Sequence, residues 1–303
     1  VGAKELIPRG ANPLTAVTKL APSLQVAQDN TFSVRGVGTA TFANTVEASV
    51  SQVVDDVVLG NREYAANAFY DIARVEVLNG PQGLLFGKNA SAGLVNITTN
   101  RPKLGEMSFI ADGELVQRAR PGKDGTGYQI RSTANVPVGE NAALRLNFIY
   151  SDQDPITVSN VNPAVRNDLG LENLGVRAKF LFEPSDALSV YVIGDYNRQR
   201  GITGRYDITF RQFGTGSQYP ARGLVAGTEN FNFAAEAPNY RDSNTGGVQA
   251  NIGLKFDNGM ELTSISAWKQ AKTNFQFDSD QTPFNFFSYN GANQKYDQYS
   301  QEL

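Results

Sequence analysis

The residues in this chain that could do chemistry are mainly carboxylates, because the sequence contains neither histidine nor cysteine. Histidine is the commonest general base and transition-metal ligand, and cysteine supplies thiol nucleophiles, zinc ligands and disulfides. No familiar set of nucleophile, base and orienting group can be assembled from the residues that remain. We therefore predict that the protein is not an enzyme, with no catalytic residues and no cofactor.

Two groups of neighbouring carboxylates could instead bind Ca²⁺ through their oxygen atoms. They are Asp55-Asp56 and Asp278-Ser279-Asp280. A dedicated calcium loop carries several oxygen ligands at fixed spacing along the chain, and neither group has that spacing. We therefore interpret both groups as solvated carboxylates and predict no metal site.

Composition limits the class of partner. The chain has 303 residues, 41% of them apolar, which suffices for about two folded domains at roughly 150 residues each. A formal net charge of −3 argues against nucleic acid as a partner. No apolar run reaches the roughly 18 residues that a transmembrane helix needs. The strand patterns and motifs therefore decide what kind of protein this is.

Beyond Gly105 the sequence repeats segments of roughly ten residues in which apolar and polar residues alternate. In the segment 144–148, for example, leucine and phenylalanine alternate with arginine and asparagine. Alternation with a period of two predicts β-strands with one apolar and one polar face. Comparable segments lie at 128–136, 174–183, 188–197 and 248–256.

The links between these strands alternate between short and long. Short turns at one rim, long loops at the other and an outward apolar band are typical of an outer-membrane β-barrel. A soluble β-sandwich also has alternating strands, but the strict order of short and long links favours the barrel. Short links are predicted at 138–141, 184–186 and 257–259, and long ones at about 119–126, 152–171, 200–243 and 271–293.

Two further strand patterns flank a compact turn within residues 72–102. Apolar and polar residues alternate at 73–77 and again at 95–98. Between them, Gly80-Pro81-Gln82-Gly83 has the composition of a tight reversal, because proline fixes one backbone dihedral and glycine allows positive φ. Taken alone, this stretch predicts a hairpin-like unit in a small α+β domain.

The same stretch resembles the end of the plug domain of TonB-dependent outer-membrane receptors. Upstream, Val34-Arg35-Gly36 and Val54-Asp55-Asp56-Val57 resemble two further elements of that domain. The resemblance implies an α+β plug domain at residues 1–104, without its N-terminal part and TonB box, followed at 105–303 by about eight strands of an antiparallel transmembrane β-barrel. The matching positions are Arg74, Glu76, Gly80-Pro81-Gln82-Gly83, Leu85-Phe86-Gly87, Asn89 to Gly93, Asn96-Ile97, Thr99 and Arg101-Pro102.

We expect the sequence to be a piece of a longer chain. Eight strands close around an interior that side chains fill, whereas a plug of about a hundred residues needs the lumen of a barrel with roughly 22 strands. The strand pattern that begins near Gln294 also runs on to Leu303, so a barrel that stopped there would leave an open edge in lipid.

The resemblance implies a receptor in the bacterial outer membrane for energy-coupled uptake of a scarce nutrient, such as siderophore-bound iron, with the plug gating the barrel. Its expected partners are outer-membrane lipid, a TonB-type energy-coupling protein and a small-molecule ligand such as a metal chelate. A signalling or adhesion receptor on the same fold, and a structural subunit of a larger outer-membrane assembly, remain alternatives. Loop sequences follow no transferable code, so the ligand itself is not predicted.

Plugs of this family present short apical loops toward the ligand, and two segments here match them. Both combine small or polar residues with one aromatic ring, which suits binding by a few hydrogen bonds and aromatic contact. The alternative is that both segments are ordinary solvated turns. The predicted ligand-binding residues are Thr39, Thr41, Phe42 and Asn44 in the first segment and Asn61, Arg62 and Tyr64 in the second.

Family plugs also pair two arginines with barrel carboxylates, one in the V-R-G element and one directly before Gly-Pro. Arg35 keeps the first position, but Asn79 replaces the second. We therefore predict that Arg35 anchors the plug through charge-assisted hydrogen bonds, with Glu114 on the first barrel strand as its candidate partner. The alternative is that Arg35 only satisfies carbonyl groups of the plug.

Overall fold

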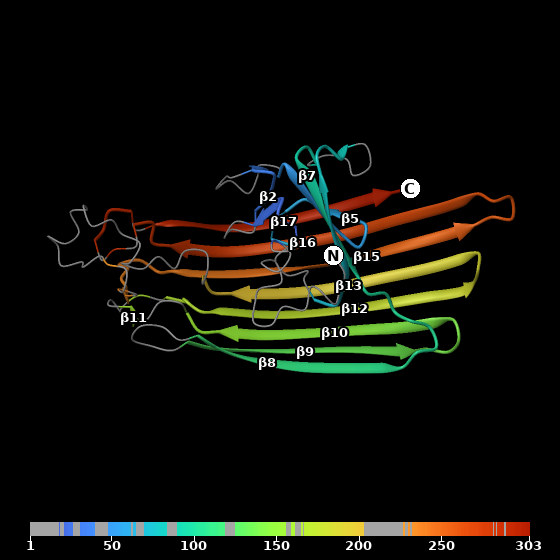
Figure 1. Cartoon of the computed structure of the whole chain (residues 1–303), viewed down its shortest axis with the longest axis horizontal. Helices are drawn as coiled ribbons and strands as arrows, with labels where there is room; N and C mark the ends of the chain where they lie inside the picture. Colours follow the sequence, from blue (N-terminus) through green and yellow to red (C-terminus); the bar gives the residue numbers. More distant parts are fainter. Residues whose placement is uncertain are drawn as a thin grey trace.

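The structure is a computed structural model of the whole chain, in which a long sheet and a smaller N-terminal sheet are the main elements (Figure 1). The two sheets account for most of the regular secondary structure. The residues that the structure describes are 18, 21–26, 31–39, 48–61, 63–64, 70–83, 90–118, 125–155, 159–160, 165, 167–202, 227, 230, 232–280, 282, 284–287 and 289–303.

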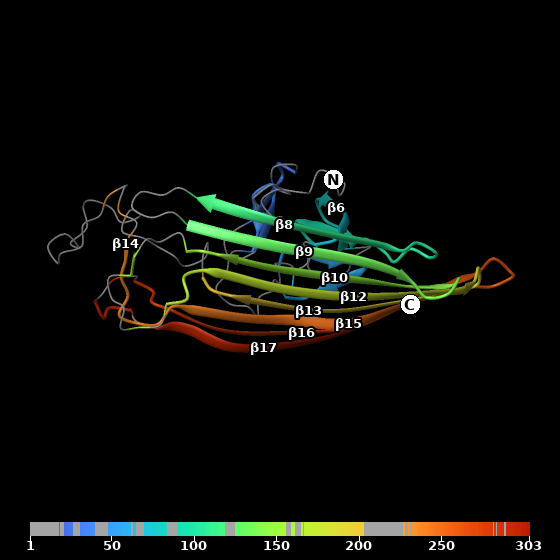
Figure 2. The ribbon, with the colours of Figure 1, turned by 90° about the horizontal axis from the view of Figure 1, so that it is seen from below.

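We call the larger sheet the wall. Its neighbouring strands are all antiparallel, and β8 and β17 form its two edges. The wall is curved, and the N-terminal strands lie on its concave side (Figure 2). In order across the wall, the strands are β8 (Ser108–Arg118), β9 (Gly125–Pro137), β10 (Ala142–Gln153), β12 (Leu171–Ser185), β13 (Leu188–Arg200), β15 (Tyr240–Lys255), β16 (Glu261–Phe277) and β17 (Asn290–Glu302).

The alternation in the sequence explains the two faces of the wall. Phe148, Val176 and Tyr196 are cross-strand neighbours on β10, β12 and β13, and all three side chains are exposed on the outer face. The preceding or following residues Asn147 and Arg177 project to the inner face and are buried there. An outward apolar face and an inward polar face are therefore confirmed, as a membrane-spanning sheet requires.

Short and long links alternate along the wall as predicted. The short turns after β9, β12 and β15 gather at one end of the wall, and the longer connections lie at the other end (Figure 1). One turn differs in position, because β12 continues through Pro184 and its pairing with β13 shifts register between Phe182 and Ser185. Proline has no N–H to give to the ladder, which accounts for an irregular pair at this point.

The smaller sheet, which we call the plug sheet, has four strands in the order β5–β4–β7–β6. Strands β4 and β7 are parallel, and the other pairs are antiparallel. Two of its strands, β6 and β7, are the strand patterns predicted on either side of the turn that begins at Gly80. The four strands are β4 (Val50–Val54), β5 (Val57–Leu59), β6 (Ile72–Asn79) and β7 (Gly93–Thr99).

A three-stranded sheet packs against the plug sheet. It consists of β1 (Leu24–Val26), β2 (Phe32–Val34) and β3 (Val37–Gly38), in that order. The two sheets share one apolar core, which stabilises the N-terminal part of the chain by removing branched and aromatic side chains from water. The buried members of this core are Leu24, Phe32, Val34, Val50, Val75, Val95 and Ile97.

Two tight turns of this region hold their backbone in the left-handed region. Arg35 and Gly36, with φ of 53° and 78°, link β2 to β3, and Asp55 and Asp56, with φ of 47° and 72°, link β4 to β5. Positive φ at both central positions is the geometry of a type I′ hairpin turn. Aspartate tolerates this region better than most residues, which explains why Asp55 and Asp56 fit this turn.

Two short strands pair in parallel within the longer connections. They are β11 (Ser159–Asn160) and β14 (Asn232–Phe233). Among the residues that the structure describes, no helix is both long enough and apolar enough to cross a membrane.

Candidate functional site

The plug sheet is held on the wall by buried ion pairs, and Asp71 accepts the first of them. Asp71 lies directly before β6. Arg145 of β10 donates from Nε to one of its carboxylate oxygens at 2.8 Å and from Nη2 to the other at 2.6 Å. The two side chains are only 5% and 11% exposed. A two-pronged contact of this kind fixes orientation as well as distance.

Lys179 of β12 extends this contact to the end of β7. It is the cross-strand neighbour of Arg145 and has no exposed surface. Its Nζ donates to the Thr99 hydroxyl at 2.5 Å and to the Asn100 carbonyl at 2.6 Å, and lies 3.7 Å from a carboxylate oxygen of Asp71. We call these five residues, Asp71, Thr99, Asn100, Arg145 and Lys179, the anchor cluster.

The anchor cluster keeps Asp71 ionised. Burial alone raises the pKa of this carboxyl, but the hydrogen bond from Arg145 and the charge of Lys179 outweigh burial. The amide of Asn100 adds a further hydrogen bond at 2.9 Å. The pKa of Asp71 is therefore lower than its ordinary value, so the negative charge is present throughout the neutral and mildly acidic range.

This depressed pKa predicts how plug attachment depends on pH. The stabilisation from ionised Asp71 should be fully present above about pH 4, the ordinary range for this carboxyl, and should be lost as pH falls through the lower pKa of the folded state. We expect the stability difference between wild type and Asp71→Asn to persist from pH 8 to about pH 5 and to shrink below about pH 4. Thermal unfolding followed by tryptophan fluorescence across this range measures the difference.

A matched control for that experiment is Asp112→Asn. Asp112 pairs with Arg131 on the wall, but the two side chains are 48% and 27% exposed, so the pair is solvated. Its amide variant should follow wild type at every pH. A wild-type minus Asp71→Asn difference that declines steadily between pH 8 and pH 5 would contradict a depressed pKa.

A second attachment runs through the turn between β4 and β5. The Asp55 carboxylate accepts hydrogen bonds from the Thr99 backbone N–H at 2.8 Å and from the Thr99 hydroxyl at 2.5 Å. The Thr99 hydroxyl thus donates to Asp55 while it accepts from Lys179. The Asp55 carbonyl accepts from Gln249 Nε2 of β15 at 2.8 Å. One turn of the plug sheet is therefore connected both to the anchor cluster and directly to the wall.

A third attachment follows β5. Glu63 forms an ion pair with Arg241 of β15, and the two side chains are 6% and 3% exposed. The Ser243 hydroxyl lies 3.5 Å from the same carboxylate oxygen, and Arg241 also donates to Gln199 of β13 at 2.9 Å. Arg241 is thereby held by two groups, one from the plug region and one from the wall.

Two cation–π contacts also join the plug region to the wall. The guanidinium of Arg177 lies 4.3 Å from the ring centre of Tyr70 and donates to its carbonyl at 3.1 Å. Burial raises the pKa of Tyr70 to about 12 although Arg177 opposes that shift, so this phenol stays neutral. On the chain that leaves β7, Arg101 lies 4.5 Å from the ring centre of Tyr191 on β13. Contacts of this kind are stronger where water is excluded.

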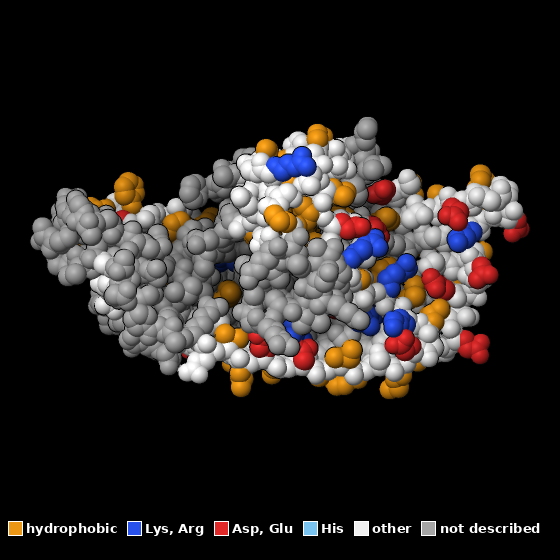
Figure 3. Space-filling model, in the orientation of Figure 1, with side chains coloured by type: hydrophobic (Ala, Val, Ile, Leu, Met, Phe, Trp, Pro, Cys, Tyr) orange, Lys and Arg blue, Asp and Glu red, His pale blue; other side chains and the backbone are white. Residues whose placement is uncertain are grey.

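In the described ion pairs of this interface, the plug side carries the negative charge and the wall carries the positive charge. Asp71 and Glu63 supply carboxylates from the plug side, and Arg145, Lys179 and Arg241 supply cations from the wall. Figure 3 shows charged side chains of both signs where the N-terminal region meets the wall and toward the short-turn end. The predicted anchor, Arg35 with Glu114, has the opposite polarity.

The structure places Arg35 and Glu114 on different elements. Arg35 is exposed in the turn between β2 and β3, and Glu114 is half-buried in the edge strand β8. Among the described residues, no ion pair joins them. Their role in plug retention stays a prediction, and the buried contacts that the structure does contain involve other residues.

The predicted ligand-binding residues fall into two groups. Thr39 is half-buried and accepts a hydrogen bond from the Ser49 N–H at 2.9 Å, while Asn61 accepts one from the Glu63 N–H at 2.9 Å. Tyr64 is 6% exposed and packs edge-on against Tyr296 of β17, so it faces the wall. The other predicted residues, Thr41, Phe42, Asn44 and Arg62, lie outside the described part of the chain.

Comparison with known proteins identifies the N-terminal domain. Residues 1–94 match the TonB-dependent Receptor Plug Domain, so this part of the chain is a plug domain of the TonB-dependent receptor family. The members of this family are bacterial outer-membrane proteins, so the predicted location is confirmed. The fold class predicted from the sequence, a plug followed by an antiparallel barrel wall, is confirmed as well.

Related sequences and structures agree with this assignment. The pesticin receptors of Yersinia enterocolitica and Yersinia pestis are 31% identical over 118 residues, which cover 37% of this chain and 17% of theirs. The ferric yersiniabactin uptake receptor FyuA of Yersinia pestis is 21% identical, with a TM-score of 0.65 over 91% of this chain and 41% of that chain.

Two further solved structures have the same fold. The ferric-catecholate import receptor Fiu of E. coli K12 is 19% identical, with a TM-score of 0.66 over 98% of this chain and 43% of that chain. The ferripyoverdine receptor of Pseudomonas aeruginosa is 17% identical, with a TM-score of 0.64 over 99% of this chain and 38% of that chain. The chain therefore spans less than half the length of each of these solved structures.

Proposed function

We propose that this chain is part of a receptor for energy-coupled uptake of a scarce nutrient across the outer membrane, and that the nutrient is an iron chelate of the siderophore class. The solved structures that it matches include uptake or import receptors for ferric yersiniabactin and ferric catecholates and a receptor for ferripyoverdine. The plug would block the barrel at rest and move when an energy-coupling protein of the TonB type acts on it.

The observation that carries this proposal is the chemistry of the interface between the plug sheet and the wall. The contacts around Asp71, Asp55 and Glu63 are hydrogen bonds and ion pairs. Polar groups can exchange such contacts for water with a small net change in free energy, whereas an apolar core cannot. An interface of this type holds a domain in one orientation and still permits its displacement.

The described apolar contact between the same two sheets is small by comparison. It is a single cluster on β5, the segment after it and β16, and its alanines offer little surface to bury. Displacement of the plug sheet would therefore expose little apolar surface to water. The buried members of this cluster are Val57, Leu59, Tyr64, Ala267 and Ala271.

Uptake of radiolabelled iron tests the proposed function. The complete receptor would be expressed in an iron-starved host without its own siderophore receptors, and ferric yersiniabactin, a ferric catecholate and ferripyoverdine would be offered separately. We expect accumulation of iron from at least one chelate, and we expect deletion of the host's energy-coupling protein to reduce it at least tenfold. Binding of a chelate without uptake would favour a signalling receptor, and uptake that survives the deletion would contradict energy coupling.

A further inference from the structure

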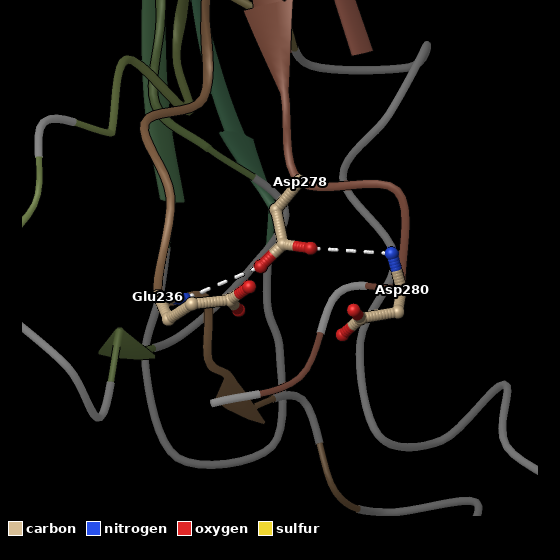
Figure 4. Close-up of side chains that lie close together, drawn as sticks. All are labelled: Glu236, Asp278 and Asp280. Atoms are coloured by element: carbon tan, nitrogen blue, oxygen red, sulfur yellow. Dashed lines mark hydrogen bonds between the residues drawn. The ribbon is translucent and has the colours of Figure 1, made fainter. Parts of the chain in front are cut away.

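Three carboxylates meet at the long-link end of the wall, away from the plug sheet. Glu236 comes from the connection between β14 and β15, and Asp278 and Asp280 follow β16. One carboxylate oxygen from each residue lies within 4.8 Å of the others. Figure 4 shows the carboxylates of Glu236 and Asp278 turned toward each other, with Asp280 on the adjoining segment. We call these three residues the loop carboxylate cluster.

Backbone hydrogen bonds hold Asp278 in place at the base of this cluster. Its side chain has no exposed surface. One carboxylate oxygen accepts from the Glu236 N–H at 3.2 Å, and the other accepts from the Asp280 N–H at 3.2 Å. The Asp278 N–H donates to Asn239 Oδ1 at 3.0 Å. These contacts join the segment before β15 to the segment after β16.

Asp280 is fixed by its own segment. One of its carboxylate oxygens accepts from the Thr282 N–H at 2.9 Å and from the Thr282 hydroxyl at 2.5 Å. The other accepts from the Phe287 N–H at 2.8 Å. A carboxylate oxygen has two lone pairs, so the oxygen that accepts only from Phe287 keeps a free coordination direction.

Glu236 supplies an independent observation that points to a ligand. Both of its carboxylate oxygens are buried although the residue as a whole is half-buried, and no described N–H or hydroxyl group donates to either oxygen. The carboxylate is directed into the cluster (Figure 4). A buried carboxylate without a partner is costly, and proteins satisfy such a group with a cation, a proton or hydrogen-bond donors. A proton shared with Asp278, or a cation bound among the three carboxylates, would satisfy Glu236.

The electrostatic surroundings of the cluster are acidic. Burial, a side-chain hydrogen bond with Glu236 and the negative charges of Asp280 and Glu236 raise the pKa of Asp278 to about 7, and a hydrogen bond from the Asp280 backbone opposes this shift. Such a site attracts either a shared proton or a metal cation.

We propose that Glu236, Asp278 and Asp280 form a Ca²⁺ site that ties the third long connection of the wall to the fourth. The three side chains offer only hard oxygen ligands, and the sequence contains no histidine or cysteine for zinc or copper. Ca²⁺ accepts six to eight oxygens in flexible geometry, including backbone carbonyls, whereas Mg²⁺ demands a compact octahedron and retains its waters. A cluster whose ligands come from two separate connections suits the larger ion, which tolerates irregular geometry.

The site would cross-link two segments that are distant in sequence. Glu236 precedes Asp278 by 42 residues, and the Glu236 backbone N–H donates to the Asp278 carboxylate. With Ca²⁺ bound, both side chains would also share a ligand, which restrains the connection after β13 against the connection after β16. This inference does not depend on the proposed uptake function, because it concerns only the loop carboxylate cluster.

Calorimetry with Ca²⁺ alone tests the proposal. The complete receptor, purified in detergent and freed of metal with EGTA, would be titrated with CaCl₂ and separately with MgCl₂. We expect one Ca²⁺ per chain, with a dissociation constant on the order of 10⁻⁴ to 10⁻³ M, as in other extracellular sites, and weaker binding of Mg²⁺. The double variant E236Q/D278N should weaken Ca²⁺ binding at least tenfold.

The amide variant keeps the shape of both side chains and removes their mutual repulsion, so it should fold. In EGTA, E236Q/D278N should therefore unfold at or above the wild-type temperature, and added Ca²⁺ should raise the unfolding temperature of wild type alone. Asp257→Asn is the matched control, because Asp257 is an exposed carboxylate in the short turn at the opposite end of the wall. No Ca²⁺ binding by wild type, or undiminished binding by E236Q/D278N, would overturn the site and leave a shared proton as the occupant.

Discussion

Replacing Asp71 with alanine should weaken the attachment of the plug sheet to the wall by about 3 to 5 kcal/mol, the usual cost of removing one partner from a buried ion pair. Arg145 would lose both hydrogen bonds to the carboxylate, and Lys179 would lose the nearest negative charge. Both cations would remain on the inner face of the wall with little access to water, because they are 11% and 0% exposed.

Two measurements detect this loss. Limited proteolysis of the purified receptor reports exposure of the plug, and uptake of a large antibiotic by cells that express the receptor reports leakage through the barrel. We expect Asp71→Ala to increase both, while the barrel stays folded in the membrane. The wall strands pair through their own backbones and do not depend on Asp71.

Two controls distinguish the effect of losing the buried ion pair from a general loss of stability. Asp112→Ala removes a carboxylate from the solvated pair with Arg131, and such pairs contribute only about 0 to 1 kcal/mol. The double variant D71A/R145M should be less impaired than the sum of the two single variants, since it removes both charges of the pair. Equal proteolysis of Asp71→Ala and Asp112→Ala would contradict the anchoring role.

The strands of the wall could be predicted from the sequence because the alternation of apolar and polar residues is visible within each strand. A strand with one lipid-facing and one lumen-facing side repeats every two residues, and this repeat is visible without knowledge of the partner strand. The same pattern assigns Arg145 and Lys179 to the polar face. Pro184 is the exception, since only the pairing in three dimensions shows that the strand continues through it.

The contacts of the anchor cluster could not be predicted in the same way. Asp71 lies 74 residues from Arg145, and their contact depends on how the plug sheet is seated against the wall. The family pattern directed attention to Arg35, which the structure places in an exposed turn. The sequence shows Asp71 directly before β6 and places Arg145 and Lys179 on the polar face of the wall. It does not show that these residues contact one another.

The loop carboxylate cluster was also missed in the sequence because its residues are distant from one another along the chain. Asp278-Ser279-Asp280 alone lacks the spacing of a calcium loop, which favoured the interpretation as solvated side chains. The structure buries Asp278 completely and brings Glu236 to it from the preceding connection. A site completed by a residue 42 positions away has no signature in a short stretch of sequence.

Glu63→Ala should release the plug much more than Arg35→Ala. Glu63 and Arg241 are 6% and 3% exposed, so removal of the carboxylate leaves a buried guanidinium with Gln199 as its described hydrogen-bond partner. We expect a loss of about 3 to 5 kcal/mol in plug attachment. The conservative variant Glu63→Gln keeps the side-chain shape and an oxygen acceptor, so it should fall between wild type and Glu63→Ala.

The exposure of Arg35 leads to an expectation opposite to the anchoring role predicted from the family pattern: Arg35→Ala should change plug attachment by less than about 0.5 kcal/mol, the usual range for an exposed side chain. The backbone at Arg35 is already in the left-handed region with φ of 53°, and alanine meets the same restriction as arginine there. Proteolysis and antibiotic leakage, measured on both variants at equal expression, compare the two positions directly. If Arg35→Ala exposes the plug as strongly as Glu63→Ala, the arginine of the V-R-G element holds the plug after all, and the polarity of the described ion pairs does not decide retention.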